Sequence, residues 1–142
     1  MKLFQFLLGI ATLPVIVMSS NTFALSSDGY YTATELKQIY NKQYSKKIPY
    51  EFGTGRITDV TIENDGSVIV NATIDEEYYK LPKLLRIELE SKGLDRLEKN
   101  YCRQVIAKKA PIAKVREITG LLKNSKGDVE RTIVYSPDMC EE

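Results

Sequence analysis

The stretch from Gly55 to Asp75, GRITDVTIENDGSVIVNATID, decides the fold class of this chain of 142 residues. On both sides of Asn64-Asp65-Gly66, apolar residues recur at every second position, which is the period of a strand with one buried face. An Asp-Gly pair supplies the positive φ angles of a tight turn, and β-branched residues suit the flanking strands. The stretch therefore predicts a β-hairpin.

The residues before this hairpin predict a helix. Thr32 and Glu35 have the spacing of a capping box, in which each side chain bonds to the backbone of the other residue. An apolar stripe at helical spacing follows, made of Leu36, Ile39, Tyr40 and Tyr44. Because a residue that precedes a proline is disfavoured in the helical region, we expect the helix to end before Pro49.

After the hairpin the apolar period becomes that of a helix. Apolar residues recur at helical spacing from Leu81 to Leu89 and again from Leu94 to Ile106. Pro82 suits a first helical turn, and glycine favours a helix end or a kink. We therefore expect two consecutive helices, divided at Gly93.

The last part of the chain predicts a second hairpin. Apolar residues in the ranges 115–122 and 129–135 flank a polar turn from Asn124 to Asp128. Gly120 indicates a bulge in the first of these strands, and Pro137 ends the second. The order helix, hairpin, two helices, hairpin predicts an α+β domain, with a single antiparallel sheet of about four strands and helices packed on one face.

The first residues have the pattern of a secretory signal peptide. Lys2 precedes an apolar run, Leu3 to Met18, that is too short and too interrupted for a confident transmembrane helix. Small residues up to Ala24 suit cleavage, so we expect residues 1–24 to be removed and residues 25–142 to form one domain, periplasmic or secreted. An uncleaved N-terminal anchor is the alternative. No cysteine lies near the cleavage point, so we expect no stable membrane anchor after cleavage.

The only two cysteines, Cys102 and Cys140, are expected to form a disulfide in an oxidising compartment. A structural zinc site needs four ligands, usually Cys and His, and the sequence has no histidine. Thioredoxin-type redox pairs have their cysteines close together in sequence, unlike these. We therefore expect a structural bridge, no metal site and no cofactor.

Charge and residue usage disfavour several functions. The chain has 20 Lys and Arg against 19 Asp and Glu, so it lacks the basic excess that nucleic-acid binding usually requires. Without histidine it also lacks the usual general base, so we expect no enzyme. A carboxylate-dependent hydrolase is the alternative of another class. It would need Glu76, Glu77, Glu88 or Glu90 in a concave pocket with raised pKa values.

Tyrosines are the remaining functional candidates. The sequence has nine tyrosines and no tryptophan. Two adjacent pairs, Tyr30-Tyr31 and Tyr78-Tyr79, lie near the ends of expected elements, where one ring of each pair would point away from the core. Tyrosine suits protein interfaces, so these four residues are the interface candidates.

Several landmarks occur together in this chain: Ile48-Pro49 after the first helix, the strands around Asp65-Gly66, Cys102 on a helix, the turn Lys126-Gly127-Asp128, and Cys140. In this arrangement the chain resembles small exported two-cysteine bacterial proteins of the quorum-sensing-regulated virulence factor type. The resemblance implies this fold, an exported location and an association with virulence.

By elimination, the leading hypothesis is an exported, non-enzymatic protein that acts by binding another protein in virulence, competition or envelope assembly. Two alternatives remain within binding proteins, namely a secretion-system accessory factor and an immunity protein that inhibits a foreign enzyme. The sequence does not identify the protein partner.

Overall fold

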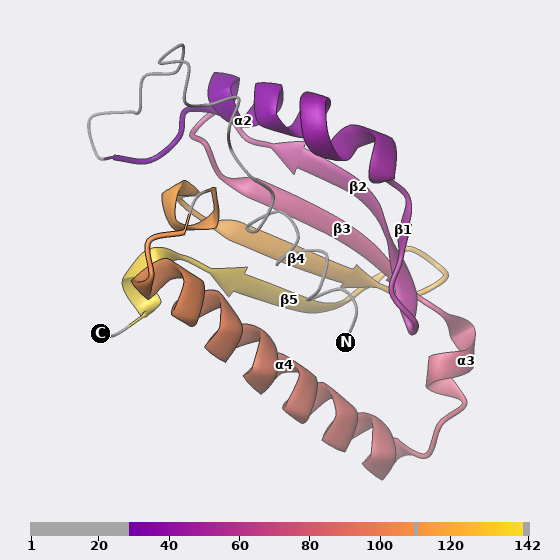
Figure 1. Cartoon of the computed structure of the whole chain (residues 1–142). Helices are drawn as coiled ribbons and strands as arrows, with labels where there is room; N and C mark the ends of the chain where they lie inside the picture. The colour runs from indigo at the N-terminus through magenta and orange to yellow at the C-terminus, as the bar shows by residue number, and fades with distance from the viewer. Residues whose placement is uncertain (1–28, 110, 141–142) are drawn as a thin grey trace.

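The computed structural model of the protein describes residues 29–109 and 111–140. The expected signal peptide, residues 1–24, lies outside the described residues. The described chain forms an α+β fold with one five-stranded mixed sheet, in which the strands lie side by side in their order along the chain (Figure 1).

The labels below are those of Figure 1. The strands are β1 (Tyr50–Glu51), β2 (Gly55–Ile62), β3 (Val68–Ile74), β4 (Ile118–Lys123) and β5 (Val129–Tyr135). The α-helices are α2 (Ala33–Ile39), α3 (Glu76–Tyr79) and α4 (Lys83–Ile106). Short π or 3₁₀ segments are η2 (Tyr40–Tyr44), η3 (Ser45–Lys47), η4 (Ile112–Lys114) and η5 (Pro137–Met139).

The first helix begins as its sequence predicts. The backbone N–H of Glu35 donates to Thr32 Oγ1 at 3.3 Å, and the backbone N–H of Thr32 donates to Glu35 Oε1 at 3.2 Å. This capping box is confirmed. The helical path continues from α2 through η2 and η3 and ends before Pro49, also as expected.

The hairpin of the opening stretch is confirmed as β2 and β3. The two strands pair antiparallel, with Ile62 opposite Val68, and Gly66 adopts the positive φ of +90° that its turn requires. The second hairpin, β4 and β5, is also confirmed, with Ile118 opposite Tyr135. Its irregular pairing lies between Leu122 and Lys123, so the bulge expected at Gly120 is displaced along the strand.

The prediction of a wholly antiparallel sheet of four strands is wrong in two respects. The two-residue strand β1 adds a fifth strand, paired antiparallel with β2. The two hairpins meet in parallel, with Val68 of β3 beside Ile118 of β4. The cause is α4, whose 24 residues span about 36 Å and return the chain to the end at which β3 began. A helical crossover of this kind is what parallel neighbours require.

The helical region between the hairpins divides at a different place from the one expected. α3 is a single turn, the break falls before Pro82, and α4 then runs through Gly93 without interruption. One glycine costs a helix only about 1 kcal/mol, which the surrounding residues offset. Two exposed ion pairs lie on either side of Gly93, each between residues one helical turn apart. They are Lys92 with Glu88 at 2.7 Å and Lys99 with Asp95 at 3.0 Å.

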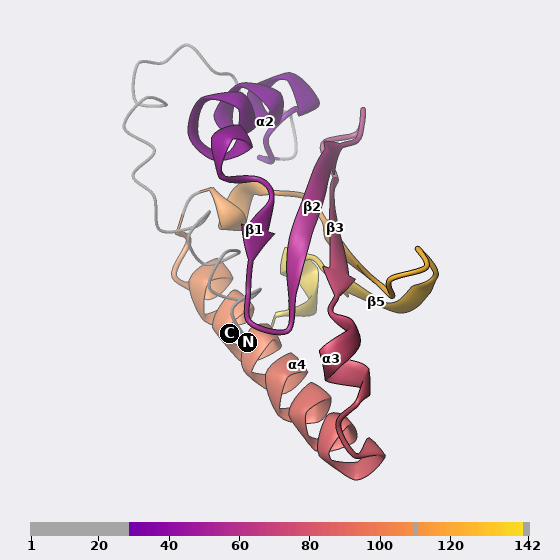
Figure 2. The ribbon, with the colours of Figure 1, turned by 90° about the vertical axis from the view of Figure 1, so that its right-hand side faces the viewer.

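The core lies between the sheet and the helices on one face, as expected. α2 and the C-terminal half of α4 lie on the same side of the sheet (Figure 2). Leu36 and Ile39 of α2, Val70 of β3, and Leu97 and Tyr101 of α4 are all buried in one cluster. None of the described helices has the length and hydropathy of a membrane-spanning segment.

Candidate functional site

The two cysteines form the expected disulfide. Cys102 on α4 and Cys140, directly after η5, are bonded with their Cα atoms 5.2 Å apart and 38 positions apart in sequence. The bond ties the end of the second hairpin to the C-terminal half of α4. Within the described ranges there is no free cysteine, and no group of three His, Cys, Asp or Glu residues could hold a metal ion.

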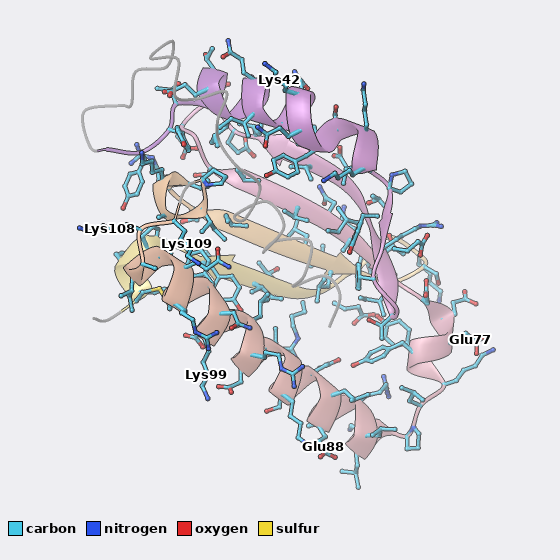
Figure 3. The ribbon with its side chains drawn as sticks, in the orientation of Figure 1. Lys42, Glu77, Glu88, Lys99, Lys108 and Lys109 are labelled. Carbon is cyan, nitrogen blue, oxygen red and sulfur yellow. A yellow bond between two sulfur atoms is a disulfide. The ribbon has the colours of Figure 1, made fainter. Side chains whose placement is uncertain are left out.

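The candidate carboxylates of a hydrolase do not form a catalytic pair. Glu76 and Glu77 are exposed in the first turn of α3, and Glu77 pairs with Lys80 at 2.9 Å. Glu88 bonds to Lys92, which lowers the pKa of that carboxyl, the opposite of what the hydrolase hypothesis requires. Figure 3 shows Glu77 and Glu88 pointing away from the body of the protein.

Glu90 differs from the other three carboxylates because it faces the sheet. Its Oε1 accepts a hydrogen bond from the Tyr78 hydroxyl at 2.8 Å, and its Oε2 pairs with Arg131 Nη2 at 2.8 Å. Both oxygens are therefore engaged, one with α3 and one with β5. This arrangement joins α4 to the edge strand of the sheet and leaves Glu90 poorly suited to act as a general acid or base.

The four candidate interface tyrosines lie in different surroundings. Tyr31 is only 3 % exposed and belongs to the core, whereas the Tyr30 ring lies partly exposed with Arg116 5.1 Å from its centroid. Tyr78 and Tyr79 are half-buried beside α4, with their rings edge to face at 5.6 Å. The structure thus separates the two pairs, and an interface role of these tyrosines stays a prediction.

The fully buried residues of α4 lie in only one half of the helix, whereas the other half contacts α3 and β5 through partly exposed side chains such as Glu90. The buried residues, Leu97 and Tyr101, lie in the C-terminal half, where the Tyr101 ring meets the Tyr135 ring at 5.2 Å. In the N-terminal half, Leu84 is 81 % exposed and Ile87 is 52 % exposed. We call residues 83–92 the free half of α4. Its exposed apolar side chains are Leu84, Leu85, Ile87 and Leu89.

A groove of about 650 Å³ runs between α4 and β5. Apolar side chains from both elements line it, namely Ile87, Leu94, Ile133 and Val134. The Glu90–Arg131 ion pair also lines the groove, and beyond that pair an adjoining pocket of about 230 Å³ opens between α3, α4 and the sheet. We call these the α4/β5 groove and the α3/α4 pocket.

Burial favours the neutral form of the two tyrosines that line the α3/α4 pocket. Burial and then the hydrogen bond to Glu90 raise the pKa of Tyr78 to about 12. Burial also raises the pKa of Tyr79, with Glu130 as the next cause. Both hydroxyls therefore stay protonated at physiological pH, and that of Tyr78 donates its proton to Glu90.

A further hollow lies under α2, between that helix and the sheet. Its volume is about 60 Å³, and it is lined by apolar or tyrosine side chains, among them Leu36, Ile39, Val60 and Val70. It offers almost no polar surface, and a cavity that holds benzene measures about 150 Å³. It therefore has neither the chemistry nor the room of a catalytic site.

The sequence interpretation missed the α4/β5 groove and its residues Ile87 and Arg131. One pattern in the sequence bears on it. Leu84, Leu85, Ile87 and Leu89 occupy more of the helix circumference than a single core-facing stripe. Exposed apolar residues beyond the buried stripe are typical of a helix surface that contacts another molecule.

No protein-family model and no curated protein matches the chain. Two solved structures are similar to it in fold. The first is the pilotin EpsS from the Vibrio vulnificus type 2 secretion system, with a TM-score of 0.51 and 14% identity over 78% of this chain and 89% of that one. The second is the type II secretion system pilotin AspS from Vibrio cholerae, with a TM-score of 0.50 and 14% identity over 76% of this chain and 92% of that one. At this identity the similarity concerns the fold alone. The resemblance to quorum-sensing-regulated virulence factors stays a prediction.

Proposed function

We propose that the protein is an exported, non-enzymatic accessory factor of a bacterial secretion system and that it acts by binding a protein of that system. The observation that carries this proposal is the fold, which is similar to two type II secretion system pilotins over about three quarters of the chain. Among the hypotheses drawn from the sequence, the secretion-system accessory factor is therefore preferred to a general virulence factor. No observation favours an immunity protein.

The free half of α4 and the α4/β5 groove are the proposed contact surface. Four large apolar side chains are exposed within two turns of one helix, and such a cluster on a folded domain is typical of a protein-binding surface. Ile87 belongs to this cluster and also lines the groove. A partner segment laid along α4 would cover Ile87 and Leu94 and contact the apolar side chains of β5.

An exported location supports the same proposal. The disulfide between Cys102 and Cys140 is a bond that persists in the periplasm or outside the cell and is rare in the cytosol. We propose that the protein works on the periplasmic side of the envelope. Cleavage after Ala24 and the absence of a membrane anchor stay predictions, because residues 1–24 lie outside the described chain.

The test is secretion by the host after deletion of the gene. We expect proteins that normally reach the medium to accumulate in the cell, and we expect the wild-type gene to restore their release. The variant Ile87→Asp places a charge in the groove and should fail to restore it, since an isolated carboxylate opposes burial against an apolar partner. Ile87 is about half exposed, so the fold should tolerate the change.

The matched control is Arg96→Asp, which introduces the same residue in the same helix. Position 96 lies nine residues from position 87, about half a turn around the helix, so it points away from the groove. It should restore secretion fully. Unchanged secretion in the deletion strain would contradict the secretion-system role. Full complementation by Ile87→Asp would contradict the groove as the contact surface.

A further inference from the structure

The α3/α4 pocket has a composition that the α4/β5 groove does not share. Its apolar lining comes from Ile74, Leu94 and Leu122, and its polar wall comes from Tyr78, Tyr79 and Arg86. The volume of about 230 Å³ exceeds the roughly 150 Å³ that suffices for benzene. The pocket therefore has room for one apolar side chain or ring together with a polar group.

Two of the charged groups in this pocket already neutralise each other. Glu90 pairs with Arg131 at 2.8 Å and accepts a hydrogen bond from Tyr78 at 2.8 Å. Each Glu90 oxygen thus has a donor, and the charge of Arg131 has a partner. These three side chains form a closed network that holds α3, α4 and β5 together around the pocket.

Arg86 is different, because no hydrogen bond or ion pair joins its guanidinium to an acceptor among the described residues. The group lies 5.8 Å from the centroid of the Tyr79 ring, and its Nε is buried without a hydrogen-bond partner among the described residues. No ion pair joins Arg86 to a carboxylate in this part of the chain. Arginine stays charged at every physiological pH, and a buried N–H without an acceptor is unfavourable. The guanidinium, which lines the pocket, therefore has a capacity to bind an anion that no described residue uses.

We propose that the α3/α4 pocket binds a carboxylate carried on an apolar stem, with Arg86 as its anchor. The planar guanidinium matches the two oxygens of a carboxylate and can donate to both. The stem lies against Ile74, Leu94 and Leu122, and the ring of Tyr79, 5.8 Å from the guanidinium, helps to hold it in place. A carboxylate on an apolar stem occurs both in polypeptides and in small organic acids, and the pocket fits either.

Glu130 allows a second test, in which the expected change in affinity has the opposite sign. It also lines the pocket, and its Oε1 accepts a hydrogen bond from Asn124 Nδ2 at 2.8 Å. A bound carboxylate would therefore share the pocket with the negative charge of Glu130. Removing that charge should therefore strengthen binding, whereas removing the charge of Arg86 should weaken it.

The experiment titrates the purified protein with 3-phenylpropionate and with its neutral amide, by isothermal calorimetry or by chemical-shift changes in NMR spectra. We expect the acid to bind at least about tenfold more tightly than the amide, the size expected for one charge-assisted hydrogen bond. Arg86→Gln should remove this preference, and Arg86→Lys should restore part of it, because the charge returns without the planar fork. Glu130→Gln should tighten binding of the acid several-fold.

Arg96→Gln is the matched control, since it removes an exposed arginine of the same helix outside the pocket. It should leave the affinity unchanged. Equal binding of acid and amide, or an unaltered affinity in an Arg86→Gln variant that melts like the parent, would overturn the proposal. So would the absence of any binding at millimolar concentrations of the acid.

A second pair of probes identifies the source of the carboxylate. A short peptide ending in phenylalanine is compared as the free acid and as the C-terminal amide. Tighter binding of the peptide acid than of 3-phenylpropionate assigns the site to a polypeptide, and an equal or weaker affinity assigns it to a small acid. Only the polypeptide source rests on the proposed function. Ile87→Asp should impair secretion without altering binding of 3-phenylpropionate, so the two proposals can fail separately.

Discussion

At the scale of single residues, Gly55 lies where β2 leaves no room for a side chain against the backbone of β3. A Cβ atom at this position would overlap the carbonyl oxygen of Thr73 and would lie 3.0 Å from the Cα of Ile74. The atoms in the way belong to the backbone of β3, which cannot move aside without breaking the pairing. Gly55 is therefore required by a contact between strands and not by its own backbone angles.

We expect Gly55→Ala to lower the free energy of unfolding by about 1 to 3 kcal/mol, the usual cost of forcing an extra methyl group into a packed site. Urea denaturation followed by circular dichroism measures this value. Gly120→Ala is the matched control in another strand, where the new Cβ would have its nearest neighbour at 3.8 Å. A control that is as destabilised as Gly55→Ala would show that the overlap is not the cause.

The sequence predicts those residue-level features whose partners lie nearby in the chain. Thr32 with Glu35, and the turn glycine Gly66, were predictable because capping boxes and tight turns are formed by a few consecutive residues. The role of Gly55 was not predictable, because the obstructing oxygen belongs to a residue in another strand. The same reason applies to Arg131, whose partner Glu90 lies on α4.

At the scale of elements, the disulfide joins η5 to α4 and thereby holds the end of the second hairpin against the crossover helix. In the chain-entropy description, closing a loop of 38 residues stabilises the fold by about 4 kcal/mol. Because α4 has only Leu97 and Tyr101 fully buried, this bond supplies a large part of its attachment.

We expect replacement of both cysteines, Cys102→Ser with Cys140→Ser, to lower the melting temperature by more than about 10 °C. Differential scanning calorimetry measures the shift, and the double replacement leaves no unpaired thiol to cross-link two molecules. The parent protein in the presence of a reductant should show a similar shift. A double variant that melts within a few degrees of the parent would contradict a stabilising role for the bond.

The first helix and the two hairpins were predictable from the sequence, but strand β1, the uninterrupted α4 and the relative direction of the hairpins were not. The alternation in β2 and β3 and the turn at Asp65-Gly66 predicted a hairpin, which is a local structure. An apolar strand such as β4 has the same period whether its neighbour runs parallel or antiparallel to it. β4 runs parallel to β3 because α4 is one uninterrupted helix that returns the chain across the sheet. The glycine at position 93 led us to expect two shorter helices instead.

At the scale of the whole molecule, buried phenols determine how stability depends on pH. Burial raises the pKa of Tyr44 and of Tyr135 to about 12, from an ordinary value of 10.0. Tyr78 is raised to about 12 as well, with Glu90 adding to burial. The folded state thus favours the neutral phenol more strongly than the unfolded chain does.

Stability from these tyrosines is fully present below pH 10 and is lost as the pH rises toward 12. We expect the urea midpoint to fall over this range, with the fully buried phenols of Tyr44 and Tyr135 each contributing up to about 3 kcal/mol and the half-buried Tyr78 less. Phenolate absorbance, recorded with the unfolding signal, measures both events together. Tyr135→Phe should show a smaller decrease than the parent, and an identical decrease would contradict the assignment to buried tyrosines.

The candidate site is formed by elements that are distant in sequence, so the sequence indicated it only indirectly. The α4/β5 groove exists because a crossover helix leaves the sheet at an angle, and no local pattern specifies that angle. The sequence analysis did propose an interface role for Tyr78 and Tyr79, which line the α3/α4 pocket. The pairing of Glu90 with Arg131 and the unpaired guanidinium of Arg86 required the three-dimensional arrangement.

The burial of α4 in only one of its halves has a consequence for its amide hydrogens. The turns near Cys102 are packed and cross-linked, so their amides should exchange with solvent deuterium only when the whole domain unfolds, whereas those of residues 83–92 should exchange through local fraying. A partner bound along these turns would slow their exchange. Hydrogen exchange in α4 can therefore map the contact surface of a partner before that partner is identified.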